Sequence, residues 1–195
     1  MAAAIDPEST LQAPPRDLEQ IEYIDNSLTF PSFTAETAWG LGCALRTRLL
    51  PFSKPVVIDI SLAHGHHCLF HATTRSGTSP DNDTWVARKR NTVLRFGYST
   101  WYMHNKYQGD EEAFAKKFGL AFGGSGVGGG NGVRAGDYAI HGGGWPVRVK
   151  GVEGIVAVVV VSGLKQDQDH GVIVQTVSEV LEAAGVEGLE KRKED

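Results

Sequence analysis

Apolar and polar positions follow helical spacing in the first long patterned segment, residues 34–50. Thr34 can cap a helix there, but Thr37 rather than Glu occupies the third helical position, so we predict an incomplete capping box. Pro51 and Pro55 end the helix. The apolar positions predict one buried stripe, formed by Trp39, Leu41, Ala44, Leu45 and Leu49.

Four segments have strand patterns. Residues 55–63 and 66–74 are rich in β-branched and apolar side chains and are separated by Gly65, which predicts a hairpin. Residues 137–149 and 152–163 predict two more strands. The last of these is apolar on both faces, so we expect it at the centre of a sheet.

Three further segments predict helices. Asp83 is a suitable N-cap for a helix that begins at 84 or 85 and continues to about 104. A short helix follows within 109–122, and helical spacing returns between 167 and 184. This order of elements predicts an α+β fold, with a mostly antiparallel central sheet of about five strands and helices on both faces.

The 195 residues fit one domain, which we place at 18–185. Residues 1–17 carry small side chains and three prolines, and they predict a disordered or loosely docked arm. Residues 123–136 are rich in glycine and predict a loop insert. They contain a literal G-x-G-x-x-G, but a helix precedes it and none follows, so we expect no dinucleotide site there. Residues 186–195 form a polar tail.

Charge and hydropathy exclude several classes of function. A net charge of −4 argues against a nucleic-acid-binding protein, which needs a large cationic surface. The longest apolar run, 155–161, is far shorter than the roughly 20 residues that span a bilayer, and the N-terminus has no secretory pattern. We therefore expect a cytoplasmic protein without membrane insertion. Cys43 and Cys68 lack the spacing of a zinc site, and no metal site is predicted.

Histidines supply the first candidate site residues. His67 and His71 would lie on one face of a strand, where two imidazoles are able to ligate a metal or haem iron. No third ligand follows at a helpful spacing, so a solvated or hydrogen-bonded pair is favoured. His141 precedes Gly142 and Gly143, which allow the backbone to approach something closely. Asp169 and His170 begin the last helix, and this position suits either an anion or a simple cap.

The cationic helix supplies the second candidate site. Arg88, Asn91 and Arg95 fall at i, i+3 and i+7 and so share one face. Two guanidinium groups with an amide between them could clamp a carboxylate ligand. The alternative, which we favour, is ionic pairing with acidic loops such as 80–83, in the same subunit or a neighbour.

Several of these segments also resemble a known family. In order and spacing they are similar to motifs of the UPF0303 group, a branch of the DUF336 superfamily that is also called HbpS/GlcG-like or haem-degrading. The resemblance covers about 56–181 and is carried by LFHA, GTSPDND, WVARKRNTVLRFGYS, HGGGWPVRVKG and VSGLKQDQDH.

The resemblance implies a profilin/PAS-like fold and assembly into a homo-oligomer. Some members of the superfamily bind haem or corrinoid, whereas activity within the UPF0303 branch is generally unassigned. The positions that match the family are His71, Pro80, Asp81, Asn82, Trp85, Arg88, Lys89, Arg90, Asn91, Phe96, His141, Gly142, Gly143, Pro146, Ser162, Gly163, Asp169 and His170.

Two functions follow as hypotheses. In the first, a homo-oligomer binds haem or another small anionic ligand, with His71, His141 or His170 near it and Arg88 and Arg95 on its carboxylates. In the second, a non-enzymatic oligomeric adaptor presents the tail at 186–195 to a protein partner, for example a chaperone or co-chaperone. The sequence leaves open whether any reaction is catalysed.

Overall fold

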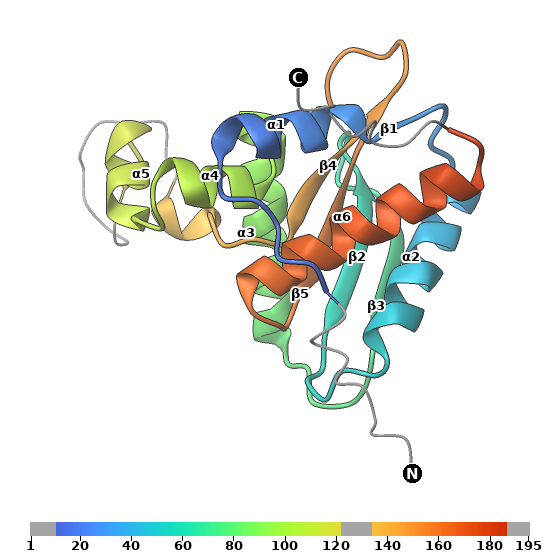
Figure 1. The fold of residues 1–195 in the computed structure, drawn as a ribbon. Coiled ribbons are helices and arrows are strands. Elements are labelled where there is room, and N and C mark those ends of the chain that lie inside the picture. Colours follow the sequence, from blue (N-terminus) through green and yellow to red (C-terminus); the bar gives the residue numbers. More distant parts are fainter. Residues whose placement is uncertain (1–10, 122–133, 187–195) are drawn as a thin grey trace.

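The computed structural model describes residues 11–121 and 134–186, and these residues form one mixed five-stranded sheet in the order β1-β4-β5-β2-β3 (Figure 1). β1 pairs with β4 in parallel, whereas the other neighbours are antiparallel. The predicted α+β fold is confirmed, with one parallel pair at the sheet's edge. The strands are β1 (Thr29–Phe30), β2 (Val57–Leu62), β3 (Cys68–Thr73), β4 (Gly144–Val149) and β5 (Ala157–Ser162).

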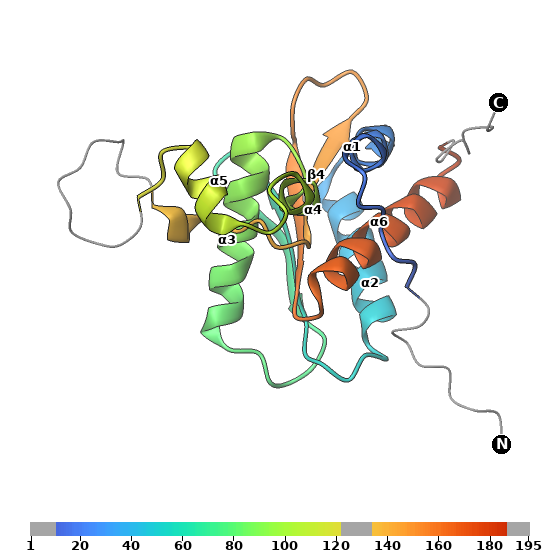
Figure 2. The same ribbon diagram turned by 60° about the vertical axis from the view of Figure 1, so that its left-hand side comes forward.

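Helices cover both faces of the sheet (Figure 2). α2 (Ala35–Leu49) and α6 (Gln166–Ala183) pack on one face, and α3 (Pro80–Phe96) packs on the other. Around α3 and α6 lie α1 (Leu18–Ser27), α4 (Thr100–Lys106), α5 (Glu111–Lys117) and the 3₁₀ helix η2 (Ala135–Asp137).

β5 is the central strand, as its apolar pattern predicts, and each of its residues is buried. Its alternate side chains pack into the two hydrophobic cores on opposite faces of the sheet. Val159 and Val161 join the core under α2 and α6, while Val158 and Val160 join the core under α3. The predicted hairpin of β2 and β3 is also confirmed, with a register shift between Ile60 and Ser61.

The predicted helix from 84 to 104 is wrong in its bounds, because the segment forms two helices. α3 begins four residues earlier, at Pro80, with Ser79 rather than Asp83 as its N-cap. Proline suits the first helical position because its missing N–H would have had no partner there. Gly97 ends the helix in the left-handed region (φ 77°), and α4 starts again behind the Ser99 cap.

Two expectations for α2 are also wrong. Trp39 is 64% exposed and does not belong to the buried stripe, which instead includes Ala38. The capping box is complete, because Thr34 and Thr37 each accept the other's backbone N–H at 3.3 Å. A threonine hydroxyl therefore does what Glu or Gln does in the usual motif.

No helix in the described ranges combines the length and hydropathy needed to cross a bilayer. The described part of the N-terminal arm, residues 11–17, lies against the domain, where the indole N–H of Trp101 donates to the Pro15 carbonyl oxygen at 2.7 Å. The predicted tail at 186–195 falls almost wholly outside the described residues, as does most of the glycine-rich insert at 123–136.

Candidate ligand cleft

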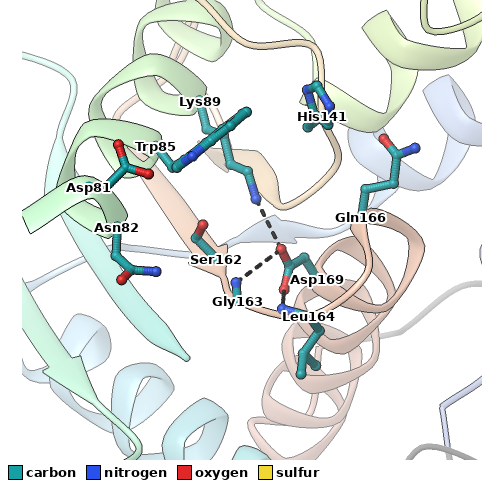
Figure 3. Close-up of a pocket in the computed structure, with 10 residues that line it drawn as sticks. All are labelled: Asp81, Asn82, Trp85, Lys89, His141, Ser162, Gly163, Leu164, Gln166 and Asp169. Carbon is teal, nitrogen blue, oxygen red and sulfur yellow. Dashed lines mark hydrogen bonds and ion pairs between the residues drawn. The ribbon is translucent and has the colours of Figure 1, made fainter. Parts of the chain in front are cut away.

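A cavity of about 280 Å³ opens between the first half of α3, the turn before β4 and the turn that joins β5 to α6 (Figure 3). Segments from three parts of the chain converge on it because β4 and β5 are neighbouring strands beneath α3. Its lining residues are Asp81, Asn82, Trp85, Lys89, His141, Ser162, Gly163, Leu164, Gln166 and Asp169.

A buried ion pair forms the floor of this cleft. Lys89 is 3% exposed, and its Nζ donates to Asp169 Oδ2 at 3.0 Å and to the Val161 carbonyl oxygen at 2.9 Å. Asp169 also accepts the backbone N–H of Leu164 at 3.0 Å. Burial raises the pKa of the Asp169 carboxyl, whereas the Lys89 ammonium and the amide N–H groups oppose that rise. The ammonium is thus fixed at the base of the cavity.

The glycines after His141 bring the backbone close to this pair. A Cβ atom on Gly143 would lie 2.3 Å from the Val161 oxygen and 2.7 Å from Lys89 Nζ, and its φ is 107°. A Cβ atom on Gly142 would lie 2.3 Å from the backbone oxygen of Gln166. The predicted close approach is present, and it is an approach to the chain itself.

An aromatic wall stands beside the floor. The Trp85 ring contacts the His141 ring edge to face, with centroids 5.1 Å apart, and the Arg88 guanidinium lies 4.4 Å from the Trp85 centroid. His141 Nδ1 is 3.2 Å from Glu111 Oε1, but the two atoms are too poorly aligned to form a hydrogen bond. His141 Nδ1 is therefore buried beside Glu111 without a hydrogen bond in the described residues, while the His141 ring lines the cleft.

Ser162 completes the set of polar groups. Its hydroxyl makes no hydrogen bond within residues 11–121 and 134–186, and its side chain points into the cavity (Figure 3). Gln166 lies across the opening from Ser162. Its side-chain oxygen accepts the Gly142 backbone N–H, and its side-chain nitrogen lies 3.3 Å from His104 Nε2. A ligand in the cleft would therefore meet hydroxyl, amide, imidazole and ammonium groups.

The predicted clamp of Arg88, Asn91 and Arg95 lies outside this cavity and makes contacts within the chain. Arg88 Nε donates to the Tyr138 carbonyl oxygen at 3.1 Å, and Asn91 Nδ2 donates to that of Asp137 at 2.9 Å. The Arg95 guanidinium lies 5.1 Å from the Tyr138 ring centroid. These side chains hold η2 and the residue after it onto α3. Their partners are carbonyl oxygens and an aromatic ring, and so differ from the predicted ionic pairing with acidic loops such as 80–83.

The structure separates the three predicted histidines. His71 lies on β3, where its Nδ1 is 3.1 Å from the buried Asp59, a carboxylate that also pairs with Arg90. His67 precedes β3, so the predicted two-histidine strand face does not form. Among the described residues, no three His, Cys, Asp or Glu side chains are placed to hold a metal ion.

His170 is buried away from the cleft. It stacks on Trp101 with ring centroids 6.0 Å apart, and burial lowers its pKa to about 3. Only His141 of the three histidines lines the cleft. The neighbouring Asp169 is likewise no helix cap, since Lys165 occupies that position and Asp169 reaches back to the turn.

Trp85, Lys89 and Ser162 were noted as positions that match the family but were not predicted as site residues, and Gln166 was missed altogether. One signal was present for Lys89, which falls between Val86 and Val93 on the apolar face of α3 and is buried with them. A cation on an apolar stripe indicates a buried partner, because an unpaired charge there would be very unfavourable. That partner, Asp169, is 80 residues away and could not be identified from spacing.

Comparison with known proteins identifies the family to which this chain belongs. Residues 33–178 match the family described as haem degrading protein HbpS-like. The chain is 37% identical over 156 residues to UPF0303 protein YBR137W of Saccharomyces cerevisiae, with 78% of each chain covered. This protein is a member of the UPF0303 family. A second UPF0303 relative, mlr5144 of Mesorhizobium japonicum, is 34% identical over 176 residues, which cover 90% of this chain and 92% of the relative.

Solved structures agree with this family assignment. The crystal structure of Ybr137w protein superposes on this UPF0303 chain with a TM-score of 0.73 at 34% identity, covering 86% of this chain and 89% of the other. A Streptomyces reticuli HbpS double mutant gives a TM-score of 0.53 at 17% identity, covering 76% and 86%. The second likeness shows a shared fold alone. The predicted membership of UPF0303 within the HbpS-like, DUF336 superfamily is confirmed.

The family's name raises the question of whether this chain binds haem. Neither the volume of the cleft nor the surroundings of His71 and His170 suit a haem group. The cleft of about 280 Å³ is below the range of sites that enclose drug-sized ligands, roughly 300–1,000 Å³, and haem is larger than such ligands. His71 faces carboxylates on both ring nitrogens, and His170 is 2% exposed. Within the described ranges, this cleft is therefore too small for haem, and neither His71 nor His170 is available as an axial ligand.

Proposed function

We propose that this UPF0303 protein binds a small polar ligand in the cleft between α3, β5 and α6, and that the ligand presents an anionic or strongly hydrogen-bond-accepting group to Lys89 and Ser162. The observation that carries the proposal is the Ser162 hydroxyl, which lines the cavity beside a fixed ammonium and has no partner within the described ranges.

Several hydrogen-bond donors line the cleft deep inside it, while the Asp81 carboxylate also belongs to the lining, on the first turn of α3. Two hydrogens of the Lys89 ammonium are used by Asp169 and Val161, which leaves the third for a ligand. The Trp85 indole N–H also makes no hydrogen bond within the described residues. The Asp169 carboxylate already accepts several bonds, so an acceptor-bearing ligand is complementary to the site.

Thermal unfolding with matched probes tests this proposal. We expect acetate and succinate at millimolar concentration to raise the Tm of the full chain, and acetamide and succinamide to raise it less, at equal ionic strength. Ser162→Ala should reduce the shift by removing one hydrogen bond, whereas Ser27→Ala, an exposed serine on α1, should leave it unchanged. Equal shifts for acids and amides, or for the two serine variants, would contradict the proposal.

Self-association is a second candidate function, favoured by one edge of the sheet. β3 is the outermost strand among the described residues, and Cys68–Thr73 contains none of the Lys, Glu or Pro residues that usually protect an edge. Trp39, 64% exposed, packs its ring against Phe70 of that strand, with centroids 5.7 Å apart. We propose that a second copy covers this edge.

Light scattering after size exclusion tests the second candidate. The wild-type chain should elute with the mass of an oligomer, and Trp39→Glu should shift it towards the monomer by placing a charge in the contact. Tyr23→Glu, at an exposed aromatic residue on α1, serves as the control and should keep the oligomer. A monomeric wild-type chain at tens of micromolar would exclude this candidate.

A further inference from the structure

A second cavity, of about 200 Å³, lies between α6, α1 and the extended segment 12–15. The segment crosses α6 as a strap (Figure 1). Most of the wall is hydrocarbon, from Ile21 and Ile24 of α1, Val174 of α6, and Ala13 and Pro14 of the strap. The cavity shares no lining residue with the cleft described above.

The strap is fastened on both sides of this cavity. The Trp101 indole N–H donates to the Pro15 oxygen at 2.7 Å, and the Gln175 side-chain amide donates to the Gln12 oxygen at 3.3 Å. Pro14 and Pro15 have no N–H, so this part of the wall offers carbonyl oxygens and no backbone donors. The strap therefore favours a guest that is apolar or carries a hydrogen-bond donor.

His170 supplies a buried polar side chain to the wall that is not fully hydrogen bonded. It is 2% exposed, and its Nδ1 has no hydrogen-bond partner among the described residues. Its ring is fixed against Trp101, with an interplanar angle of 23°. Burial lowers its pKa to about 3, so the imidazole is neutral at physiological pH and carries one donor nitrogen and one acceptor nitrogen.

We propose that this cavity binds a small, mainly apolar molecule with one hydroxyl group, and that His170 forms the hydrogen bond to that hydroxyl. The size is sufficient, since an apolar cavity of about 150 Å³ takes a benzene ring. The neutral imidazole is suited to an uncharged hydroxyl, because a charged guest would lose its hydration among the aliphatic side chains. This site is independent of the cleft that holds Lys89 and Ser162.

Calorimetric titration of the full chain with p-cresol and with toluene tests this proposal, because the two probes differ by one hydroxyl group. Both should bind at millimolar concentration or below, with p-cresol about five- to tenfold tighter. In His170→Leu, p-cresol should fall to within about twofold of toluene, because the hydrogen-bond partner is gone while the apolar wall remains. Binding of neither probe, or equal binding of both to the wild type, would overturn the proposal.

A second variant locates the binding site and does not depend on the stability of the His170 variant. Val174→Phe fills the cavity from α6 and should abolish binding of both probes. Val180→Phe makes the same change on the same helix, in a hollow beside α2, and should leave binding unchanged. If Val174→Phe binds p-cresol as the wild type does, the guest lies elsewhere and the proposal is wrong.

Discussion

At the scale of single residues, the pair Lys89 and Asp169 determines the shape of the cleft. The pair connects α3 to the start of α6, and Lys89 also bonds the end of β5 through the Val161 oxygen. Buried ion pairs add little net stability, because desolvation of both charges offsets their attraction. Their value here is positional, since the lysine fixes a charged donor at the floor of the cavity.

Breaking this pair on one side should be far more harmful than replacing both partners. We expect Lys89→Met to lower the free energy of unfolding by about 3–5 kcal/mol, because it leaves the Asp169 carboxylate buried without its counterion. The double variant Lys89→Met, Asp169→Leu should recover most of that loss. Urea denaturation measures both, with the exposed Lys117→Met as a control within about 0.5 kcal/mol of the wild type. Additive effects of the two substitutions would contradict this account.

The glycine turn gives a second prediction at this scale. Gly143→Ala should destabilise the fold by about 2 kcal/mol or more, because φ is 107° and the new Cβ would meet a backbone oxygen. Gly40→Ala, within α2, has open space around its Cβ and should stabilise by about 0.5–1 kcal/mol. Thermal unfolding followed by circular dichroism compares them, and a neutral Gly143→Ala would show that the turn is able to relax.

At the scale of elements, the sequence predicted those strands whose burial is visible in the local pattern of apolar and polar residues. The period-2 pattern of the hairpin and the double-sided apolar run of β5 were sufficient, since burial on one or both faces fixes those side chains. α1 and β1 were missed. β1 has only two residues, too few for a pattern, and it is defined by its pairing with Arg148 and Val149, far along the chain.

The site was predicted only in part, for the same reason. The glycines after His141 were recognised from local composition. The polar face of α3 suggested either a ligand clamp or, as we favoured, ionic pairing with acidic loops, and the structure instead has contacts to carbonyl oxygens and an aromatic ring. A guanidinium group satisfied by a carbonyl oxygen 50 residues away, as in Arg88 and Tyr138, has no signature in local spacing. Exposed Trp39 illustrates the opposite error, because large apolar residues on a helix are usually buried but need not be.

The contact between α3 and the segment around η2 yields an element-scale prediction. Asn91→Ala should remove the bond to the Asp137 oxygen and loosen residues 137–139. Amide exchange of Tyr138 and Ala139 should become faster, while β5 should keep its protection, because its hydrogen bonds belong to the central sheet. Hydrogen exchange read by mass spectrometry or NMR distinguishes this local loosening from global destabilisation, which would accelerate both regions equally.

At the scale of the whole molecule, two buried titratable groups on different elements have opposite effects on how stability depends on pH. Asp25 of α1 accepts the Trp145 indole N–H at 3.0 Å, and burial raises its pKa to about 6. His170 of α6 has its pKa lowered to about 3, also by burial. Burial favours the neutral form of each residue, but the two titrate with opposite effects on stability.

The pH dependence of stability follows from the sign of each shift. Between about pH 3.8 and 6 the native state holds the Asp25 proton more tightly than the unfolded chain, so this group's contribution, about 3 kcal/mol in full, is lost as pH rises. Between about pH 6.5 and 3 the unfolded chain binds the His170 proton more tightly, so that contribution, about 5 kcal/mol in full, is lost as pH falls. Over roughly pH 4–6 the two slopes nearly cancel.

Substitution of either group should therefore reveal the pH dependence of the free energy of unfolding that the other group causes. As pH falls from 6 to 4, Asp25→Asn should lose about 2 kcal/mol of stability relative to the wild type, because the opposing gain is absent. His170→Leu should gain a similar amount relative to the wild type over the same range. Urea unfolding at half-unit pH intervals measures both differences. Because each comparison is made against the wild type, exposed carboxylates that titrate alike in both proteins do not affect the measured difference. Parallel pH profiles for all three proteins would mean that neither buried group titrates as its surroundings in the fold require.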